Sequence, residues 1–216
     1  MPAVLFDMDG VLVDSEDYWV DFQREEILPE TVPDEDVDLA ETSGMNFREI
    51  YDYLEAEYGT AISREEWIRR FNAAAEEIYT ERAAALDGLD DLLADLEDRG
   101  VTTALVSSSP HDWIGMVIER FDLEGEFDRV ISADDIDAAS KPAPDVFEHA
   151  ADEIGVPTDE CVVVEDSENG IEAAARAGTI VVAYRLDAHG DIDRSSADTV
   201  VDSPAELREQ VMKSIR

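Results

Sequence analysis

The sequence predicts an α/β fold in which a doubly wound parallel sheet carries an inserted all-helical domain. Three observations lead to this prediction. Short apolar strands alternate with helices from about residue 84 onward, helical periodicity alone runs from about 15 to 83, and one apolar run precedes that stretch. Alternating strands and helices imply right-handed crossovers and hence a parallel sheet. We therefore expect a core domain of residues 1–14 and 84–216 and a helical domain of residues 15–83.

The first predicted strand, Ala3 to Phe6, runs directly into acidic residues, and the helical stretch follows. Two pairs in that stretch have the spacing of a capping box, namely Asn46 with Glu49 and Ser63 with Glu66. Apolar residues follow each pair at helical spacing and predict one buried face on each helix. They are Phe47, Ile50, Tyr51, Leu54 and Tyr58 after the first pair, and Trp67, Phe71, Ala74, Ala75 and Ile78 after the second.

The alternating part of the chain begins with a helical stripe of leucines, after which Gly100 lies where a helix C-terminus favours glycine. The β-branched run that follows predicts a buried strand. The predicted strands are 101–106, 129–132, 162–164, 180–183 and 199–201, and the predicted helices are 110–121, 144–154, 170–177 and one from 205 onward.

Polar side chains gather where these strands end. Asp7 and Asp9 follow the first strand, Ser107 follows the second, and Glu165 and Asp166 follow the strand from 162. In an open parallel sheet the ligand site lies outside the carboxyl ends of the strands. Because side chains alternate along a strand, the spacing of Asp7 and Asp9 predicts that both carboxylates share one face. The sequence therefore predicts a site at this edge.

Four motifs in order carry a resemblance to a known family. They are Asp7-Met8-Asp9-Gly10-Val11-Leu12, Ser107 after a strand, Lys141-Pro142, and Glu165-Asp166-Ser167 with Gly170. They resemble the motifs of the haloacid dehalogenase superfamily, which has a Rossmann-like core. Asp14-Ser15-Glu16 before the helical stretch, and Ser140 to Asp145, are similar to the branch with β-phosphoglucomutase, phosphoglycolate phosphatase and sugar-phosphate phosphatases. The resemblance implies that the helical domain is a cap over the site.

The resemblance also implies a role for each site residue. Asp7 matches the family's nucleophile and Asp9 its general acid and base. Ser107 matches the hydroxyl that binds phosphate, and Lys141 would neutralise the charge shared by the phosphate and Asp7. Ser108 is a further candidate for binding the substrate.

A metal ion is expected as well, because carboxylates that face a phosphate dianion repel it. Asp7, Asp166 and the main-chain carbonyl of Asp9 form an oxygen-only set suited to Mg²⁺. Glu165 completes this set if it is a direct ligand, whereas in other members of the family this position lies behind the ligands. His111, His149 and His189 lack ligand spacing, so no zinc site is expected.

Two further groups of residues have alternative interpretations. Ser109-Pro110 has the pattern of an N-cap followed by proline, which would aim free backbone N–H groups at a phosphate. Alternatively, Ser108 and Ser109 only cap the helix. Arg48 lies in a stretch that resembles a specificity loop and is a candidate contact for a second anionic or polyol group. Alternatively, it pairs with a nearby glutamate.

These roles favour a Mg²⁺-dependent phosphatase that acts on a small phosphorylated metabolite. A sugar phosphomutase is the second candidate, but Trp19 and Phe47 stand where β-phosphoglucomutases carry a histidine and an arginine. Asp9 argues against dehalogenation, which needs no such acid. A non-catalytic phosphometabolite-binding protein is expected to lose Asp7 or Asp9, and the sequence keeps both.

The net charge of the chain also bears on which classes of partner it can bind. The chain of 216 residues has 55 Asp and Glu against 16 Lys and Arg, which gives a net charge of −39. A surface of this sign disfavours nucleic acid and anionic membranes. The single cysteine, Cys161, excludes an intramolecular disulfide. With no apparent signal sequence or membrane span, we expect a cytoplasmic protein, and we expect a monomer.

The acidity, together with only two lysines, Lys141 and Lys213, resembles cytoplasmic proteins of extreme halophiles. We therefore predict that salt stabilises the fold, because the Debye length falls to about 3 Å at molar ionic strength and repulsion between carboxylates is then screened. The midpoint of thermal unfolding should rise by more than about 10 °C between ~0.1 M and ~3 M KCl. Sucrose at matched osmolality is the control, and a midpoint independent of KCl would contradict the prediction.

Overall fold

The core of the protein is a six-stranded parallel sheet in the order β3-β2-β1-β4-β5-β6. The computed structural model describes residues 2–35, 37–39, 42, 44–186 and 192–215. The strands are β1 (Ala3–Phe6), β2 (Thr102–Ser107), β3 (Arg129–Ser132), β4 (Cys161–Glu165), β5 (Ile180–Tyr184) and β6 (Thr199–Val201). β1 lies at the centre, between β2 and β4, so the residues that follow these three strands are neighbours at one edge.

Alternate residues of the central strand face two separate apolar cores. Val4 and Phe6 belong to the larger core, and Ala3 and Leu5 belong to the smaller one. The larger core also includes helices α5 (Leu89–Asp98), α6 (His111–Arg120) and α9 (Pro204–Ser214), whereas α7 (Asp145–Ile154) and α8 (Glu168–Arg176) pack in the smaller core. Helices therefore cover both faces, and the predicted doubly wound sheet is confirmed.

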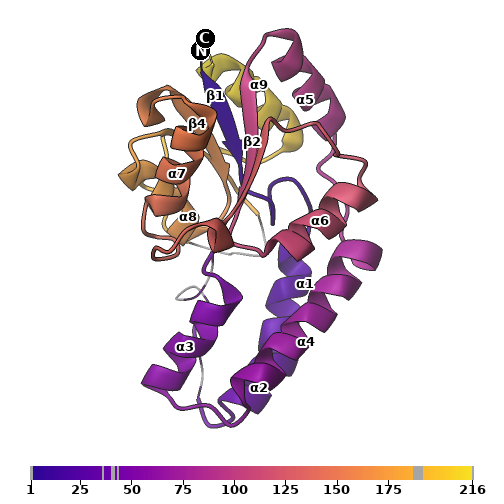
Figure 1. Cartoon of the computed structure of the whole chain (residues 1–216), viewed down its shortest axis with the longest axis vertical. Coiled ribbons are helices and arrows are strands. Elements are labelled where there is room, and N and C mark those ends of the chain that lie inside the picture. Colours follow the sequence, from indigo (N-terminus) through magenta and orange to yellow (C-terminus); the bar gives the residue numbers. More distant parts are fainter. Residues whose placement is uncertain (1, 36, 40–41, 43, 187–191, 216) are drawn as a thin grey trace.

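The chain between β1 and β2 contains the inserted helical segment, which lies beyond the carboxyl ends of the strands (Figure 1). The segment begins with one helical run that contains a π-helical stretch. Two further helices follow, and the second of them continues into another π-helical stretch. The elements are α1 (Glu16–Asp21), η1 (Phe22–Ile27), α2 (Leu28–Thr31), α3 (Phe47–Glu57), α4 (Arg64–Glu77) and η3 (Ile78–Arg82). Short 3₁₀ turns follow β3 and precede β4, namely η4 (Ala133–Asp135) and η5 (Thr158–Glu160).

The two connections between this segment and the sheet lie side by side. Asp14 N donates to Ala84 O at 2.8 Å, and Leu86 N donates to Leu12 O at 2.9 Å. The helical segment therefore enters and leaves the core at one place, and we keep 15–83 as its proposed extent. No helix in the described part of the chain is long and apolar enough to cross a membrane.

Two details of the predicted helices were wrong. Tyr58 is 39% exposed, because α3 ends at Glu57 and Gly59 then takes a left-handed conformation, so Tyr58 leaves the buried face. At the start of α4, Ser63 accepts a hydrogen bond from Glu66 N as expected. The Glu66 carboxylate, however, binds Arg69 and Arg70 along the exposed face of the helix. The expected reciprocal bond is therefore replaced by ion pairs.

Candidate active site

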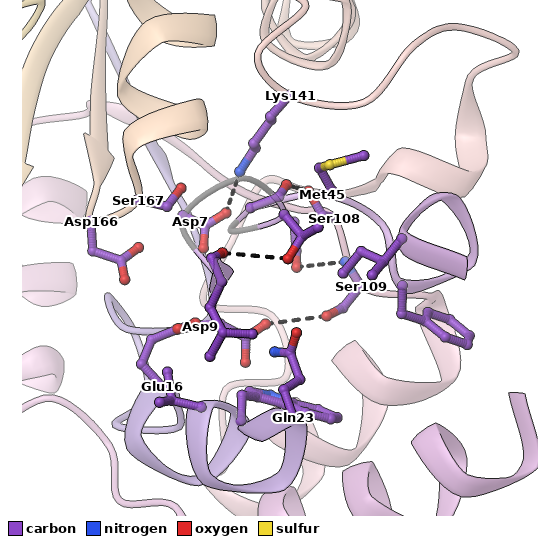
Figure 2. Close-up of a pocket in the computed structure, with 18 of the residues that line it drawn as sticks. Asp7, Asp9, Glu16, Gln23, Met45, Ser108, Ser109, Lys141, Asp166 and Ser167 are labelled. Atoms are coloured by element: carbon purple, nitrogen blue, oxygen red, sulfur yellow. Dashed lines mark hydrogen bonds and ion pairs between the residues drawn. The ribbon is translucent and has the colours of Figure 1, made fainter. Parts of the chain in front are cut away.

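A cavity of about 230 Å³ lies at the carboxyl edge of the sheet, between the core and the helical segment. The structure brings most of the predicted site residues together in its wall (Figure 2). These residues are Asp7, Asp9, Ser107, Ser108, Lys141, Glu165 and Asp166. Arg48 is not among the residues that line the cavity.

Lys141 is the centre of this group. Its Nζ donates to Asp7 Oδ1 at 2.5 Å and to Glu165 Oε1 at 2.6 Å, and the residue is only 2% exposed. Burial disfavours the ammonium, but the charges of Asp7 and Glu165 outweigh this effect and raise the pKa of Lys141. A buried cation therefore holds one oxygen of each carboxylate.

Glu165 has both carboxylate oxygens engaged. While Oε1 binds Lys141, Oε2 accepts hydrogen bonds from Asp166 N at 2.9 Å and from Ser167 N and Ser167 Oγ, both at 3.0 Å. Gly170 makes this packing possible, because a Cβ there would lie 1.8 Å from Glu165 Oε1. The geometry favours a role in which Glu165 orients Lys141 over direct binding of a metal.

Asp7 and Asp166 are the carboxylates best suited to bind a cation. Burial, together with the neighbouring acidic groups, raises the pKa of each, although Lys141 opposes this shift. Within the described residues, no group of three or more His, Cys, Asp or Glu side chains is arranged to hold a metal ion. Two carboxylates nevertheless fit Mg²⁺, which keeps several waters and binds one or two carboxylates together with substrate phosphate.

The Asp9 carboxylate is held by three hydroxyl groups. Its Oδ1 accepts from Ser15 Oγ and from Tyr79 Oη, both at 2.7 Å, and its Oδ2 accepts from Ser109 Oγ at 3.1 Å. Burial raises the pKa of Asp9, and the three hydrogen bonds oppose the rise by favouring the charged form. Both Asp7 and Asp9 reach the cavity, but strand alternation is not the reason, because β1 ends at Phe6.

The N-terminus of α6 differs from the sequence prediction. The N-cap residue is Pro110, with no side-chain cap, and the helix begins at His111. Ser109 does not cap it, because its hydroxyl donates to Asp9 while its N–H donates to Ser107 Oγ at 3.0 Å. The hydroxyls of Ser107 and Ser109 therefore make hydrogen bonds within the site and do not cap α6.

Comparisons with known proteins agree with this geometry. The family model described as haloacid dehalogenase-like hydrolase matches residues 4–184. The chain belongs to this family. It is 33% identical to hexitol phosphatase B of Escherichia coli over 195 residues, which are 83% of this chain and 82% of that protein. It is 30% identical to phosphoglycolate phosphatase of Xanthomonas campestris over 215 residues, 96% and 95% of the two chains.

A solved structure of a hydrolase from Pseudomonas syringae has the same fold, with a TM-score of 0.78, 25% sequence identity and 99% of each chain covered. The expected Rossmann-like core of a haloacid dehalogenase-like hydrolase is thus confirmed. Several relatives that match over 82% or more of both chains are named as phosphatases. The protein is therefore an enzyme of the haloacid dehalogenase-like hydrolase family.

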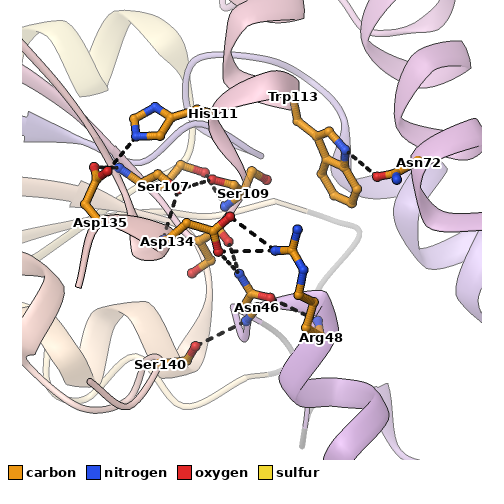
Figure 3. A network of polar contacts seen from close by, with 12 residues as sticks. Asn46, Arg48, Asn72, Ser107, Ser109, His111, Trp113, Asp134, Asp135 and Ser140 are labelled. Atoms are coloured by element: carbon orange, nitrogen blue, oxygen red, sulfur yellow. Dashed lines mark hydrogen bonds and ion pairs between the residues drawn. The ribbon is translucent and has the colours of Figure 1, made fainter. Parts of the chain in front are cut away.

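In this hydrolase a polar network joins the helical segment to the core (Figure 3). Arg48 Nη1 lies 3.2 Å from both carboxylate oxygens of Asp134, and Asn46 Nδ2 donates to Ser108 O at 3.0 Å. The Ser108 hydroxyl donates to Gly44 O at 2.8 Å. In this arrangement, Arg48 and the Ser108 hydroxyl bind protein groups and hold the segment against the core.

The two histidines that the structure describes, His111 and His149, lie on different helices. His111 Nε2 lies 2.7 Å from Asp135 Oδ1 beside this network, His149 lies on α7 away from the cavity lining, and His189 lies outside the described residues.

Sequence reasoning missed two residues that shape the site. Tyr79, on η3, is fully buried, and its hydroxyl binds Asp9 and accepts from Trp19 Nε1 at 3.1 Å. The helical periodicity that includes Ile78 indicated burial at this end of the run, but not a partner 70 residues away. Gln23 lines the cavity from η1, where the π-helical stretch departs from regular helical spacing.

Four aromatic side chains belong to the apolar wall of the cavity. Trp19, Phe47 and Phe71 come from the helical segment and Trp113 from α6, and we call them the aromatic cluster. Neighbouring rings in the cluster are nearly parallel, with centroids 4.7–5.7 Å apart. Trp19, which stands where β-phosphoglucomutases carry a histidine, lines the cavity and also packs in the larger core.

Gly170→Ala should destabilise the protein, because the added methyl group would collide with the carboxylate of Glu165, which orients Lys141. The new Cβ would overlap Glu165, which is held by its hydrogen bonds and by Lys141, so the free energy of unfolding should fall by about 1–3 kcal/mol. Urea unfolding in molar KCl measures the change.

Gly115→Ala is the matched control, because Gly115 also lies within a helix but has open space within 4 Å. It should raise the free energy of unfolding by about 0.5–1 kcal/mol. Equal effects of the two substitutions would show that the contact with Glu165 is unimportant.

Proposed function

We propose that this hydrolase is a Mg²⁺-dependent phosphatase that hydrolyses a small phosphorylated metabolite through an aspartyl-phosphate on Asp7. The observation that carries the proposal is the buried contact of Lys141 with Asp7, beside Asp166 and within one cavity with Asp9. Such a group offers a nucleophile, a positive charge and a proton donor to one phosphate ester. The names of the relatives, hexitol phosphatase B and phosphoglycolate phosphatase, support a small substrate.

In the first step, a carboxylate oxygen of Asp7 attacks phosphorus, and the bond from phosphorus to the leaving oxygen breaks. Lys141 holds Asp7 Oδ1, which orients Oδ2 toward the substrate. Asp9, in its protonated form, gives its proton to the leaving oxygen, which departs as an alcohol. Ser107, which lines the cavity, and the backbone N–H groups near the start of α6 would bind the phosphoryl oxygens.

In the second step, water attacks phosphorus of the aspartyl-phosphate. Asp9, now a carboxylate, takes the proton from this water, and the bond between phosphorus and Asp7 breaks. Inorganic phosphate leaves, and both aspartates return to their starting states. General acid–base help of this kind contributes on the order of 10²- to 10⁴-fold to the rate.

Asp7, Asp166 and the main-chain carbonyl of Asp9 would hold Mg²⁺, with Glu165 orienting Lys141 behind them. The bound ion supplies positive charge that offsets the repulsion between these carboxylates and the phosphate. The helical segment of residues 15–83 acts as the cap that excludes bulk water. We also propose that the protein acts as a cytoplasmic monomer on small molecules and not on nucleic acid or membranes, which its charge of −39 supports.

Asp7→Asn should lower kcat by about 10⁴-fold or more for every substrate, because an amide is a poor nucleophile. The assay is release of inorganic phosphate from a panel with phosphoglycolate and hexose phosphates, in molar KCl with and without Mg²⁺. Removal of Mg²⁺ by a chelator should also abolish turnover.

Turnover that persists without a metal, or in Asp7→Asn, would refute this mechanism. Analysis of the products separates a phosphatase from a phosphomutase. A phosphatase releases phosphate in proportion to the substrate consumed, whereas a mutase returns an isomeric sugar phosphate.

Tyr79→Phe should move the pH profile of kcat/KM. The Tyr79 hydroxyl stabilises the charged form of Asp9, so its loss raises the pKa of Asp9 further. Because Asp9 must be protonated in the first step, the alkaline limb should move upward by about one pH unit.

Tyr51→Phe is the control, because the Tyr51 hydroxyl binds Thr60 and Ile62 O within the helical segment. It should leave the profile where it is. An alkaline limb that is identical in Tyr79→Phe and in the parent protein would contradict the assigned role of Asp9.

A further inference from the structure

The charged groups around the cavity are strongly unbalanced. The described residues that line it include six carboxylates and two cations, namely Asp7, Asp9, Glu16, Asp38, Glu165 and Asp166 against Arg24 and Lys141. Lys141 is engaged by Asp7 and Glu165, and Arg24 is exposed. Residues 36, 40–41, 43 and 187–191, which are not described, contain no lysine or arginine. Lys141, the proposed Mg²⁺ and the proton on Asp9 would offset the charge at the phosphate end of the cavity. A second negative charge on a substrate would then meet two carboxylates, Glu16 and Asp38, and one cation, Arg24.

Arg48 does not change this balance. Its guanidinium pairs with Asp134, and it lies outside the cavity lining. The cation that the sequence offered for a second anionic group is thus used to join the helical segment to the core. Like charges placed together in a desolvated site repel each other, so this arrangement selects against anionic leaving groups.

Gln23 supplies a neutral polar group on the same side of the cavity. Its side chain extends from the helical segment toward Asp9 and Ser109 (Figure 2). Among the described residues, its side-chain amide has no hydrogen-bond partner, although the residue is partly buried. Asp9 is the group that donates a proton to the leaving oxygen, so Gln23 lies where the leaving group would be. An amide can both donate to and accept from a hydroxyl.

The aromatic cluster forms the apolar wall of the same space. Trp19 and Phe47 line the cavity together with Gln23, and the cluster is almost fully buried. Such a wall offers a surface to the C–H face of a carbon skeleton and no partner for a carboxylate. A neutral leaving group can use both the wall and the amide.

We propose that Gln23 and the aromatic cluster form a subsite for an uncharged, hydroxylated leaving group, that of a sugar or sugar alcohol, and that the surrounding carboxylates reject leaving groups with a second anion. This inference rests on the proposed phosphatase function and narrows its substrates. It makes Gln23 a residue that determines specificity and removes phosphoglycolate from the preferred substrates.

The test uses pairs of substrates that differ only in a hydroxymethyl group or a carboxylate. Sorbitol phosphate is compared with phosphogluconate, and glycerol phosphate with phosphoglycerate, in molar KCl with Mg²⁺. Phenyl phosphate is included as an ester that has neither group. The hydroxymethyl member of each pair should have a kcat/KM higher by about tenfold or more.

Gln23→Leu should lower kcat/KM for sorbitol phosphate and glycerol phosphate by about five- to tenfold and leave phenyl phosphate within about twofold. Gln210→Leu is the matched control, because Gln210 lies on α9 and binds Thr199 and Ser214. It should leave every substrate unchanged.

Equal or better hydrolysis of the carboxylate members would overturn the subsite, and loss of that hydrolysis in Arg24→Gln would then identify an anion-binding site in its place. An equal effect of Gln23→Leu on phenyl phosphate would also overturn it, because the loss would not depend on hydroxyl groups. If no ester is hydrolysed, phenyl phosphate included, the proposed phosphatase function itself fails. The two failures are thus distinguishable.

Discussion

The contact of Lys141 with Asp7 and Glu165 is the interaction on which the site depends. The neighbouring parallel strands β1 and β4 end side by side, which places several carboxylates at one buried edge, and burying unpaired charges costs several kcal/mol each. One ammonium and a set of backbone N–H groups offset this cost in part, and the remaining negative charge suits a divalent cation. Gly10 and Gly170 leave the space that these carboxylates occupy, because a Cβ at Gly10 would overlap Asp166 and a Cβ at Gly170 would overlap Glu165.

A second constraint links the acid–base residue to the helical segment. Asp9 accepts one hydrogen bond from the hydroxyl of Ser15, where the chain enters the segment. It accepts another from the hydroxyl of Tyr79, shortly before the chain returns to the core. Both donors reach the same carboxylate oxygen. The ionisation of Asp9 therefore depends on the positions of both connections. Trp19, a member of the aromatic cluster, donates a hydrogen bond to the Tyr79 hydroxyl and so joins the cluster to this network.

The sequence predicted what depends on periodicity and on the order of strands. Convergence of Asp7, Ser107 and Asp166 followed from parallel topology, since carboxyl ends of neighbouring strands share an edge. The hydroxyl of Tyr79, the engagement of Glu165 and the pairing of Arg48 with Asp134 depend on distances across the tertiary structure, which no local pattern contains. Ser109 shows the same limit, because its expected capping role competes with a carboxylate 100 residues away.

The scarcity of lysine has a practical consequence for handling the protein. Lys141 is buried, whereas Lys213 is exposed on α9, at the end of the molecule opposite the helical segment (Figure 1). Reagents that modify side-chain amines will therefore react at one remote point and spare the cavity. Coupling to a solid support through Lys213 would orient every molecule alike, with the helical segment directed away from the support.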